Sequence, residues 1–183
     1  MNTIVLRPVT FHWVHGDEDD PLDQCAHGRI EFVINGQSFV NPDTGPWSLS
    51  LAALYFLRCT IDQHIFGDDL TESNFLVPCC GHNPWLVGEG KYKLMCMGCN
   101  DGVDIEVLHR GSETVLRDKS GHEEAVFRRQ WISAVLHFVA EVEDFYRRCS
   151  PKADVCDEKL DQPGWIAFWE EWKSLKLLAQ NVA

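Results

Sequence analysis

The sequence predicts an α+β fold, in which an antiparallel sheet of hairpins and a meander packs against two main helices plus a C-terminal aromatic helix. Two strand-like runs flank Asn35-Gly36, the kind of dipeptide that most strongly favours a two-residue hairpin. Val103–His109 alternates between two faces as a half-buried strand does. Apolar residues recur at helical spacing along Glu123–Cys149, which indicates a helix buried on one side.

The predicted elements follow one another without a long linker. A strand is expected over Ile4–Val14, a hairpin over Arg29–Ile34 and Gln37–Val40, and a helix from Trp47 to His64. In the second half we expect a strand at Asn74–Val77, a hairpin over Trp85–Val87 and Tyr92–Met95, strands at Val103–His109 and Glu113–Arg117, and helices over Glu123–Cys149 and Trp165–Ala179.

Length and charge limit the classes of protein. A chain of 183 residues is expected to form one domain, residues 1–183, large enough to fold without a metal or disulfide. The formal net charge of −12 argues against nucleic-acid or anionic-membrane binding and is compatible with a basic protein partner.

The N-terminus does not resemble a secretory leader, and no apolar run reaches the ~20 residues of a membrane span. We therefore expect a cytoplasmic protein. In that compartment its eight cysteines are expected to be reduced thiols or metal ligands.

Four residues have the spacing of a small zinc ribbon. Cys79 and His82 precede a predicted hairpin, and Cys96 and Cys99 follow it. A hairpin brings two such ligand pairs together, and four protein ligands make a closed, structural zinc site. Cys80 is an alternative to Cys79, and inert buried thiols are the alternative to zinc.

The same residues allow an enzyme hypothesis. Cys79 or Cys80 would be the nucleophile and His82 or His109 the base, with or without zinc. No sequence feature supplies an orienting partner or an oxyanion hole, so the sequence favours binding over catalysis.

A second concentration of Cys and His residues lies near the N-terminus. Cys25 and His27, with His12 and His15, are expected to be loop and strand-end residues with ordinary hydrogen bonds. The alternative is that they add ligands to the zinc cluster, if this segment lies beside it. The acidic run Asp17–Asp23 lacks the pattern of a calcium loop and is expected to be a solvated loop or a contact for a basic partner.

The last helix has an aromatic face. Trp165, Trp169 and Trp172 share one side with Phe168 and Leu175. Such a face must be covered, either by the rest of the chain or by a protein partner or second copy that uses the three Trp residues as anchors.

Several motifs resemble a family of small acidic bacterial proteins of unknown function. They are Pro78-Cys79-Cys80-Gly81, Gly98-Cys99, Gly102-Val103-Asp104-Ile105-Glu106-Val107 with His109, Val142-Glu143-Asp144-Phe145-Tyr146 and Phe168-Trp169 with Trp172. The resemblance implies a bacterial cytosolic protein and carries no activity or cofactor. In general character such proteins are similar to immunity and adaptor proteins. We therefore expect a non-enzymatic interaction protein.

Overall fold

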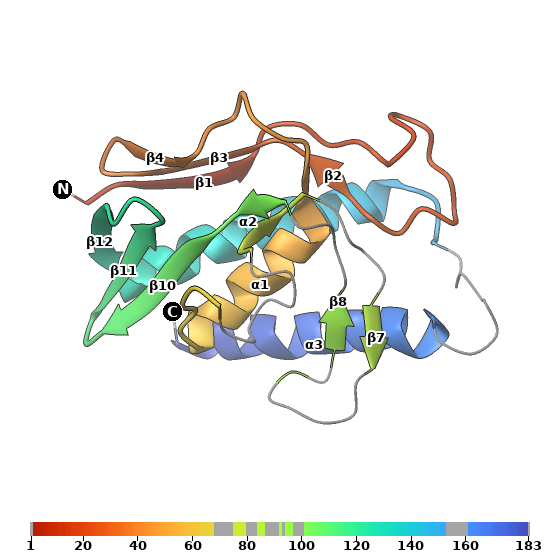
Figure 1. The fold of residues 1–183 in the computed structure, drawn as a ribbon. Helices are drawn as coiled ribbons and strands as arrows, with labels where there is room; N and C mark the ends of the chain where they lie inside the picture. Colours follow the sequence, from red (N-terminus) through yellow and green to blue (C-terminus); the bar gives the residue numbers. More distant parts are fainter. Residues whose placement is uncertain are drawn as a thin grey trace.

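The computed structural model describes residues 2–67, 75–79, 84–86, 92, 94–96, 101–152 and 161–182, and confirms the α+β fold (Figure 1). Its helices are α1 (Leu49–Ile61), α2 (Arg128–Arg148) and α3 (Asp161–Val182). Its strands are β1 (Ile4–Pro8), β2 (His27–Gly28), β3 (Ile30–Ile34), β4 (Gln37–Val40), β5 (Trp47–Ser48), β6 (Val77–Pro78), β7 (Pro84–Leu86), β8 (Leu94–Cys96), β9 (Gly102–Val103), β10 (Ile105–Arg110), β11 (Glu113–Asp118) and β12 (Glu123–Phe127).

The predicted antiparallel sheet is divided into smaller units. Two three-stranded sheets have the orders β1-β3-β4 and β10-β11-β12, and the pairs β2-β5, β6-β9 and β7-β8 complete the described strands. Figure 1 shows the β1-β3-β4 sheet above α1 and α2, with α3 below α1. Helix α1 lies inside, between the β1-β3-β4 sheet and α3, whereas α2 and α3 each keep an exposed side.

Helix α1 is the centre of the core. Every residue from Leu49 to Thr60 is buried, as expected of a helix that is apolar all round. The only charged side chain in it, Arg58, is fully buried, and its Nε donates to Glu171 of α3 at 2.7 Å. This ion pair joins α1 to α3.

The Asn35-Gly36 hairpin is confirmed. β3 and β4 pair antiparallel, and both turn residues have positive φ, 50° at Asn35 and 86° at Gly36. A type I′ turn requires positive φ at both central positions, which Gly and Asn adopt most readily.

Two sequence predictions are wrong in extent. The first strand ends at Pro8 rather than Val14, since only residues 4–8 pair with β3. The long helix begins at Arg128 rather than Glu123, because Glu123–Phe127 pairs with β11 as β12. That pairing overrides the helix propensity of Glu and Ala in the segment.

Candidate functional site

The segments that hold the predicted zinc ligands begin and end at the same strand pairs. Pro78 is opposite Gly102 in β6-β9, and Pro84 is opposite Cys96 in β7-β8. Residues 79–83, which include Cys79 and His82, and residues 97–101, which include Cys99, thus both lead along the chain from one strand pair to the other, and Cys96 is the last residue of β8. A zinc ribbon requires this arrangement of its two ligand-bearing turns.

The four predicted ligands are only partly described. Cys79 is half-buried and its N–H donates to the carbonyl of Asp101 at 3.0 Å, whereas the Cys96 thiol is fully buried. His82 and Cys99 lie outside the described residues. Within the described ranges no group of three or more Cys, His, Asp or Glu side chains is placed to hold a metal ion.

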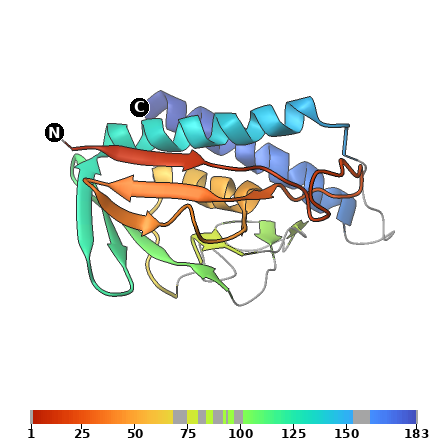
Figure 2. The ribbon, with the colours of Figure 1, turned by 90° about the horizontal axis from the view of Figure 1, so that it is seen from above.

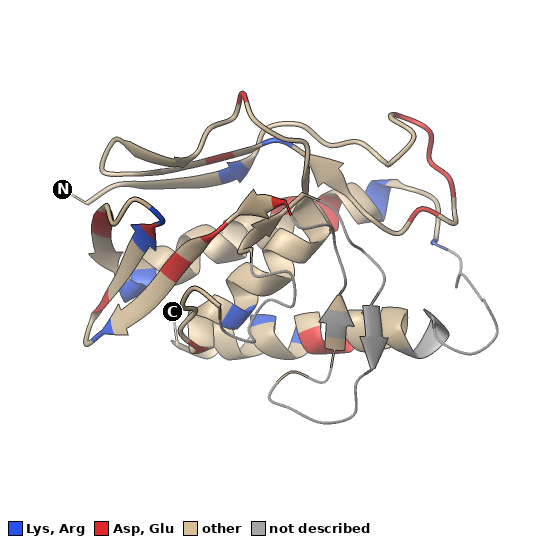
Figure 3. Ribbon diagram, in the orientation of Figure 1, with Lys and Arg blue, Asp and Glu red and all other residues tan. Residues whose placement is uncertain are grey.

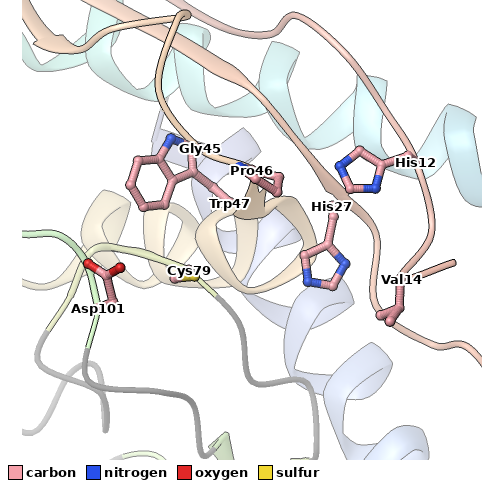
Figure 4. Close-up of a pocket in the computed structure, with 8 residues that line it drawn as sticks. All are labelled: His12, Val14, His27, Gly45, Pro46, Trp47, Cys79 and Asp101. Carbon is pink, nitrogen blue, oxygen red and sulfur yellow. The ribbon is translucent and has the colours of Figure 1, made fainter. Parts of the chain in front are cut away.

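Two residues of the N-terminal Cys/His concentration share a pocket with Cys79, and their contribution of zinc ligands stays a prediction. A pocket of about 330 Å³ is lined by His12 and His27 from the N-terminal region and by Cys79 and Asp101 from the central region (Figure 4). Trp47 forms another of its walls. The exposed His15 is not among the residues that line it.

The two histidines are held as a pair. His12 and His27 exchange both backbone hydrogen bonds at 2.9 Å, and their rings stack with centroids 5.8 Å apart. Each Nδ1 donates to a backbone carbonyl, His12 to Trp13 at 2.8 Å and His27 to Cys25 at 3.0 Å. Burial lowers the pKa of His27, and a charge on His12 lowers it further, so the neutral ring presents Nε2 as an acceptor.

The Cys25 thiol contacts this Nε2 of His27. Its Sγ lies 3.7 Å from Nε2 of His27 and 3.1 Å from Oγ of Ser48, the residue before α1. The Cys25 side chain is buried and does not line the pocket. A nucleophile needs access to its substrate, whereas this buried thiol links His27 of β2 to Ser48 at the start of α1.

His109 has a different environment from Cys79. Its Nδ1 contacts Oγ1 of Thr114 at 3.2 Å and its Nε2 contacts the Asp62 carbonyl at 3.1 Å. It does not line the pocket that contains Cys79. The described part of the chain therefore does not bring together Cys79 and His109, the nucleophile and base of one form of the enzyme hypothesis.

The aromatic face of α3 packs on α2. Trp172 is fully buried and its Nε1–H donates to Glu143 at 2.7 Å. Trp169 meets the Tyr146 ring edge-on, with centroids 5.1 Å apart, and Trp165 stacks on Phe168. Trp165 and Trp169 are half-buried. Contact with the rest of the chain thus covers much of this face, and partner binding by its three Trp residues stays a prediction.

The acidic loop is tied to the end of α2. Asp19 accepts hydrogen bonds from Nζ of Lys152 at 2.7 Å and from the N–H of Ser150 at 2.6 Å. These two bonds lower the pKa of Asp19 to about 2. Nζ of Lys152 also lies 3.4 Å from the centroid of the Trp13 ring, so this part of the predicted solvated loop has a fixed position.

The sequence analysis missed a groove between β1 and α2. It is lined by residues 2–7 and, on α2, by Arg129, Gln130, Ser133, Ala134, His137 and Glu141. We call it the β1–α2 groove. Its volume of about 970 Å³ is near the upper end of the ~300–1,000 Å³ typical of ligand pockets. Figure 2 shows α2 running beside β1, which is the edge strand of its sheet.

The edge of β1 that faces the groove has backbone groups without a hydrogen-bond partner in the described part of the chain. Asn35 donates to the Thr3 carbonyl and Val9 to the Arg29 carbonyl, so the odd-numbered residues of this segment bond to β3. Backbone groups alternate in direction along an antiparallel pair, so those of Ile4 and Leu6 point the other way. Among the described residues none bonds to these groups.

Pro8 fits this alternation. It is at an even-numbered position of β1, opposite Ile30, where a missing N–H removes no hydrogen bond to β3. Proline within a sheet is confined largely to edge strands. Pro8 was therefore the sequence signal that could have identified β1 as an edge.

The two ends of the groove have opposite charges. Gln130 Nε2 donates to the Asn2 carbonyl at 3.0 Å, which places neighbouring Arg129 at the start of β1. Glu141 lies at the other end, near Arg7. Burial raises the pKa of Glu141, and the smaller effect of the Arg7 charge lowers it. Neither Arg129 nor Glu141 forms an ion pair with a described residue.

Comparisons with protein-family models, with curated proteins and with solved structures find no match to this chain. Within the described part of the chain, no helix combines the length and the apolar character that crossing a membrane requires.

Proposed function

We propose that this protein is a non-enzymatic interaction protein that binds a partner protein in the β1–α2 groove. The observation that supports the proposal is the unbonded backbone edge at Ile4 and Leu6, which faces a groove of about 970 Å³. Exposed strand edges are templates for pairing with another chain, and natural proteins usually protect them.

The charge of the chain favours a partner of a particular kind. A net charge of −12 opposes self-association and accelerates encounter with a basic protein. Acidic residues occur along several elements, including the acidic loop and β10 (Figure 3). We therefore expect a basic partner protein rather than a second copy of this chain. An immunity-like or adaptor-like role in a bacterial cytosol is consistent with such binding.

Peptide selection tests this proposal with a defined probe. Random 12-residue peptides displayed on phage are selected on the wild-type protein, and the affinities of the recovered peptides are measured by fluorescence polarisation. Ser133→Trp fills the groove from α2, and Ser174→Trp makes the same change at an exposed position of α3 outside the groove.

We expect selected peptides to bind the wild type and the Ser174→Trp variant equally and the Ser133→Trp variant at least tenfold more weakly. Selected peptides that bind all three proteins alike would place the binding surface elsewhere. A selection that enriches no sequence would oppose the proposal itself.

A structural zinc ribbon is a second proposal. The registers Pro78 opposite Gly102 and Pro84 opposite Cys96 support it, because they join the ends of the two segments that hold the predicted ligands. Zinc held by Cys79, His82, Cys96 and Cys99 would fix the β7-β8 hairpin and would leave no open position for chemistry.

Metal analysis tests the ribbon directly. We expect about one zinc per chain, measured by mass spectrometry on protein purified without chelator, and none after Cys99→Ser. The matched control is Cys149→Ser, a cysteine at the end of α2 outside the cluster. Equal zinc in both variants, or none in the wild type, would contradict the ribbon.

A further inference from the structure

The β1–α2 groove presents the chemistry of one specific kind of ligand. At Ile4 and Leu6 each residue offers an N–H donor and a carbonyl acceptor along the same edge, and the Pro8 carbonyl adds a third acceptor. Donors and acceptors in this order along an edge match the backbone of an extended chain. A small molecule or a helix does not present such a row.

Side chains of the bound segment would alternate between two environments. Val5 and Arg7 point to the exposed face of the sheet, whereas Leu6 and Pro8 are buried. Residues opposite Ile4 and Leu6 would therefore face α2, where Ser133 and Ala134 leave room for short apolar side chains.

The unpaired charges define the ends of the segment. Arg129 lies beside the start of β1 and Glu141 beside Arg7. A strand that runs antiparallel to β1 begins near Glu141 and ends near Arg129. A basic side chain at its start and an acidic one at its end would pair with these two residues.

We propose that the groove binds an extended, partner-derived segment that adds to the sheet as an antiparallel strand beside β1, with a basic residue facing Glu141 and an acidic residue facing Arg129. This inference rests on the proposed function and specifies its ligand. A second copy of β1 fits less well. Centred on Val5, it would set Pro8, which lacks a backbone N–H, opposite Asn2, and the net charge of −12 on each copy opposes the pairing.

The test attaches the proposed strand to the protein. Because β1 lies at the N-terminus, the sequence Lys-Thr-Val-Thr-Val-Thr-Asp followed by an Asn-Gly turn is fused ahead of Asn2. The turn makes the added strand antiparallel to β1, and the covalent link removes the need for high affinity. Hydrogen exchange of the Ile4 and Leu6 amides is measured by NMR. A fusion in which both valines are replaced by proline is the control.

We expect the Ile4 and Leu6 amides to exchange at least tenfold more slowly in the valine fusion than in the proline fusion, with Val5 unchanged. Equal exchange in the two fusions would overturn strand addition. A third fusion exchanges the terminal Lys and Asp, and we expect weaker protection from it. Equal protection from the valine fusion and the exchanged fusion would overturn the charge assignment.

These outcomes are separate from those of the proposed function. If the fusions give no protection while selected peptides still lose affinity for Ser133→Trp, the groove binds a partner in another mode. If the fusions protect Ile4 and Leu6 while no displayed peptide is enriched, the edge accepts a strand but the proposed partner binding fails.

Discussion

Replacement of Arg58 is expected to destabilise the whole fold, because this fully buried side chain joins three elements. Its Nε donates to Glu171 of α3 at 2.7 Å, and its Nη2 donates to the Leu94 carbonyl of β8 at 3.0 Å. The guanidinium also lies 4.1 Å from the centroid of the Tyr92 ring. The contact with Leu94 ties the hairpin that contains Cys96 to α1.

The size of the effect follows from these contacts. Hydrogen bonds to charged groups contribute about 1.5–3 kcal/mol each, and removal of one partner of a buried ion pair costs about 3–5 kcal/mol. The Glu171 side chain is 18% exposed, so water can partly solvate its carboxylate when Arg58 is removed. We therefore expect Arg58→Met to reduce the free energy of unfolding by about 3 kcal/mol, at the lower end of the range for a broken buried pair.

Urea denaturation followed by circular dichroism measures this change. The double variant Arg58→Met with Glu171→Met removes both charges, and we expect it to recover more than half of the loss because no uncompensated carboxylate remains. A loss below about 0.5 kcal/mol for Arg58→Met, the usual range of a surface substitution, would refute the reasoning. So would a double variant less stable than the single one.

Three further predictions concern the N-terminal region. The bonds from Lys152, the larger effect, and from the Ser150 N–H lower the pKa of Asp19 to about 2. A carboxyl with a lowered pKa stabilises the fold above its unfolded pKa, near 3.8 for Asp19, and that contribution is lost as the pH falls through about 2. NMR titration should therefore show a midpoint near 2 in the wild type and a clearly higher one in Lys152→Met, and equal midpoints would contradict the assignment. Gly28→Ala would place a Cβ 1.8 Å from the Thr10 carbonyl oxygen. We expect urea denaturation to show a free energy of unfolding lower by about 3 kcal/mol or more, at the upper end for overpacking. An unchanged free energy would show that the backbones of Gly28 and Thr10 are not this close. Tyr146→Phe removes a hydroxyl that donates to the Gln24 carbonyl at 2.6 Å and accepts from the Ala26 N–H at 3.2 Å. We expect thermal denaturation to show that the variant is less stable by about 1–3 kcal/mol. An unchanged melting temperature would mean that water replaces the hydroxyl.

Local sequence patterns predicted the elements whose conformation depends mainly on their own residues. The Asn35-Gly36 turn was predictable because its backbone conformation depends on the two residues themselves. Helix α1 was predictable because an uninterrupted apolar run has few alternatives to burial. The segment Glu123–Phe127 was mispredicted because its strand state depends on pairing with β11 rather than on its own composition.

The candidate sites depend on residues that are distant in sequence. The β1–α2 groove exists because β1 packs beside a helix that begins more than 100 positions later, and no local pattern contains that packing. The pairing of His12 with His27 and the shared pocket with Cys79 are likewise results of tertiary structure. The sequence identified the residue types in both Cys/His clusters but not their neighbours.

Hydrogen exchange of the unmodified protein tests most directly the claim that the β1 edge is open. In the wild type, Val5 and Arg7 bond to β3, whereas Ile4 and Leu6 face the groove without a described partner. Amides with stable hydrogen bonds in a core sheet exchange far more slowly than unbonded ones. We predict that the Ile4 and Leu6 amides exchange roughly a hundredfold faster than those of Val5 and Arg7. Equally slow exchange at all four amides would show that the edge is already paired and would contradict the account.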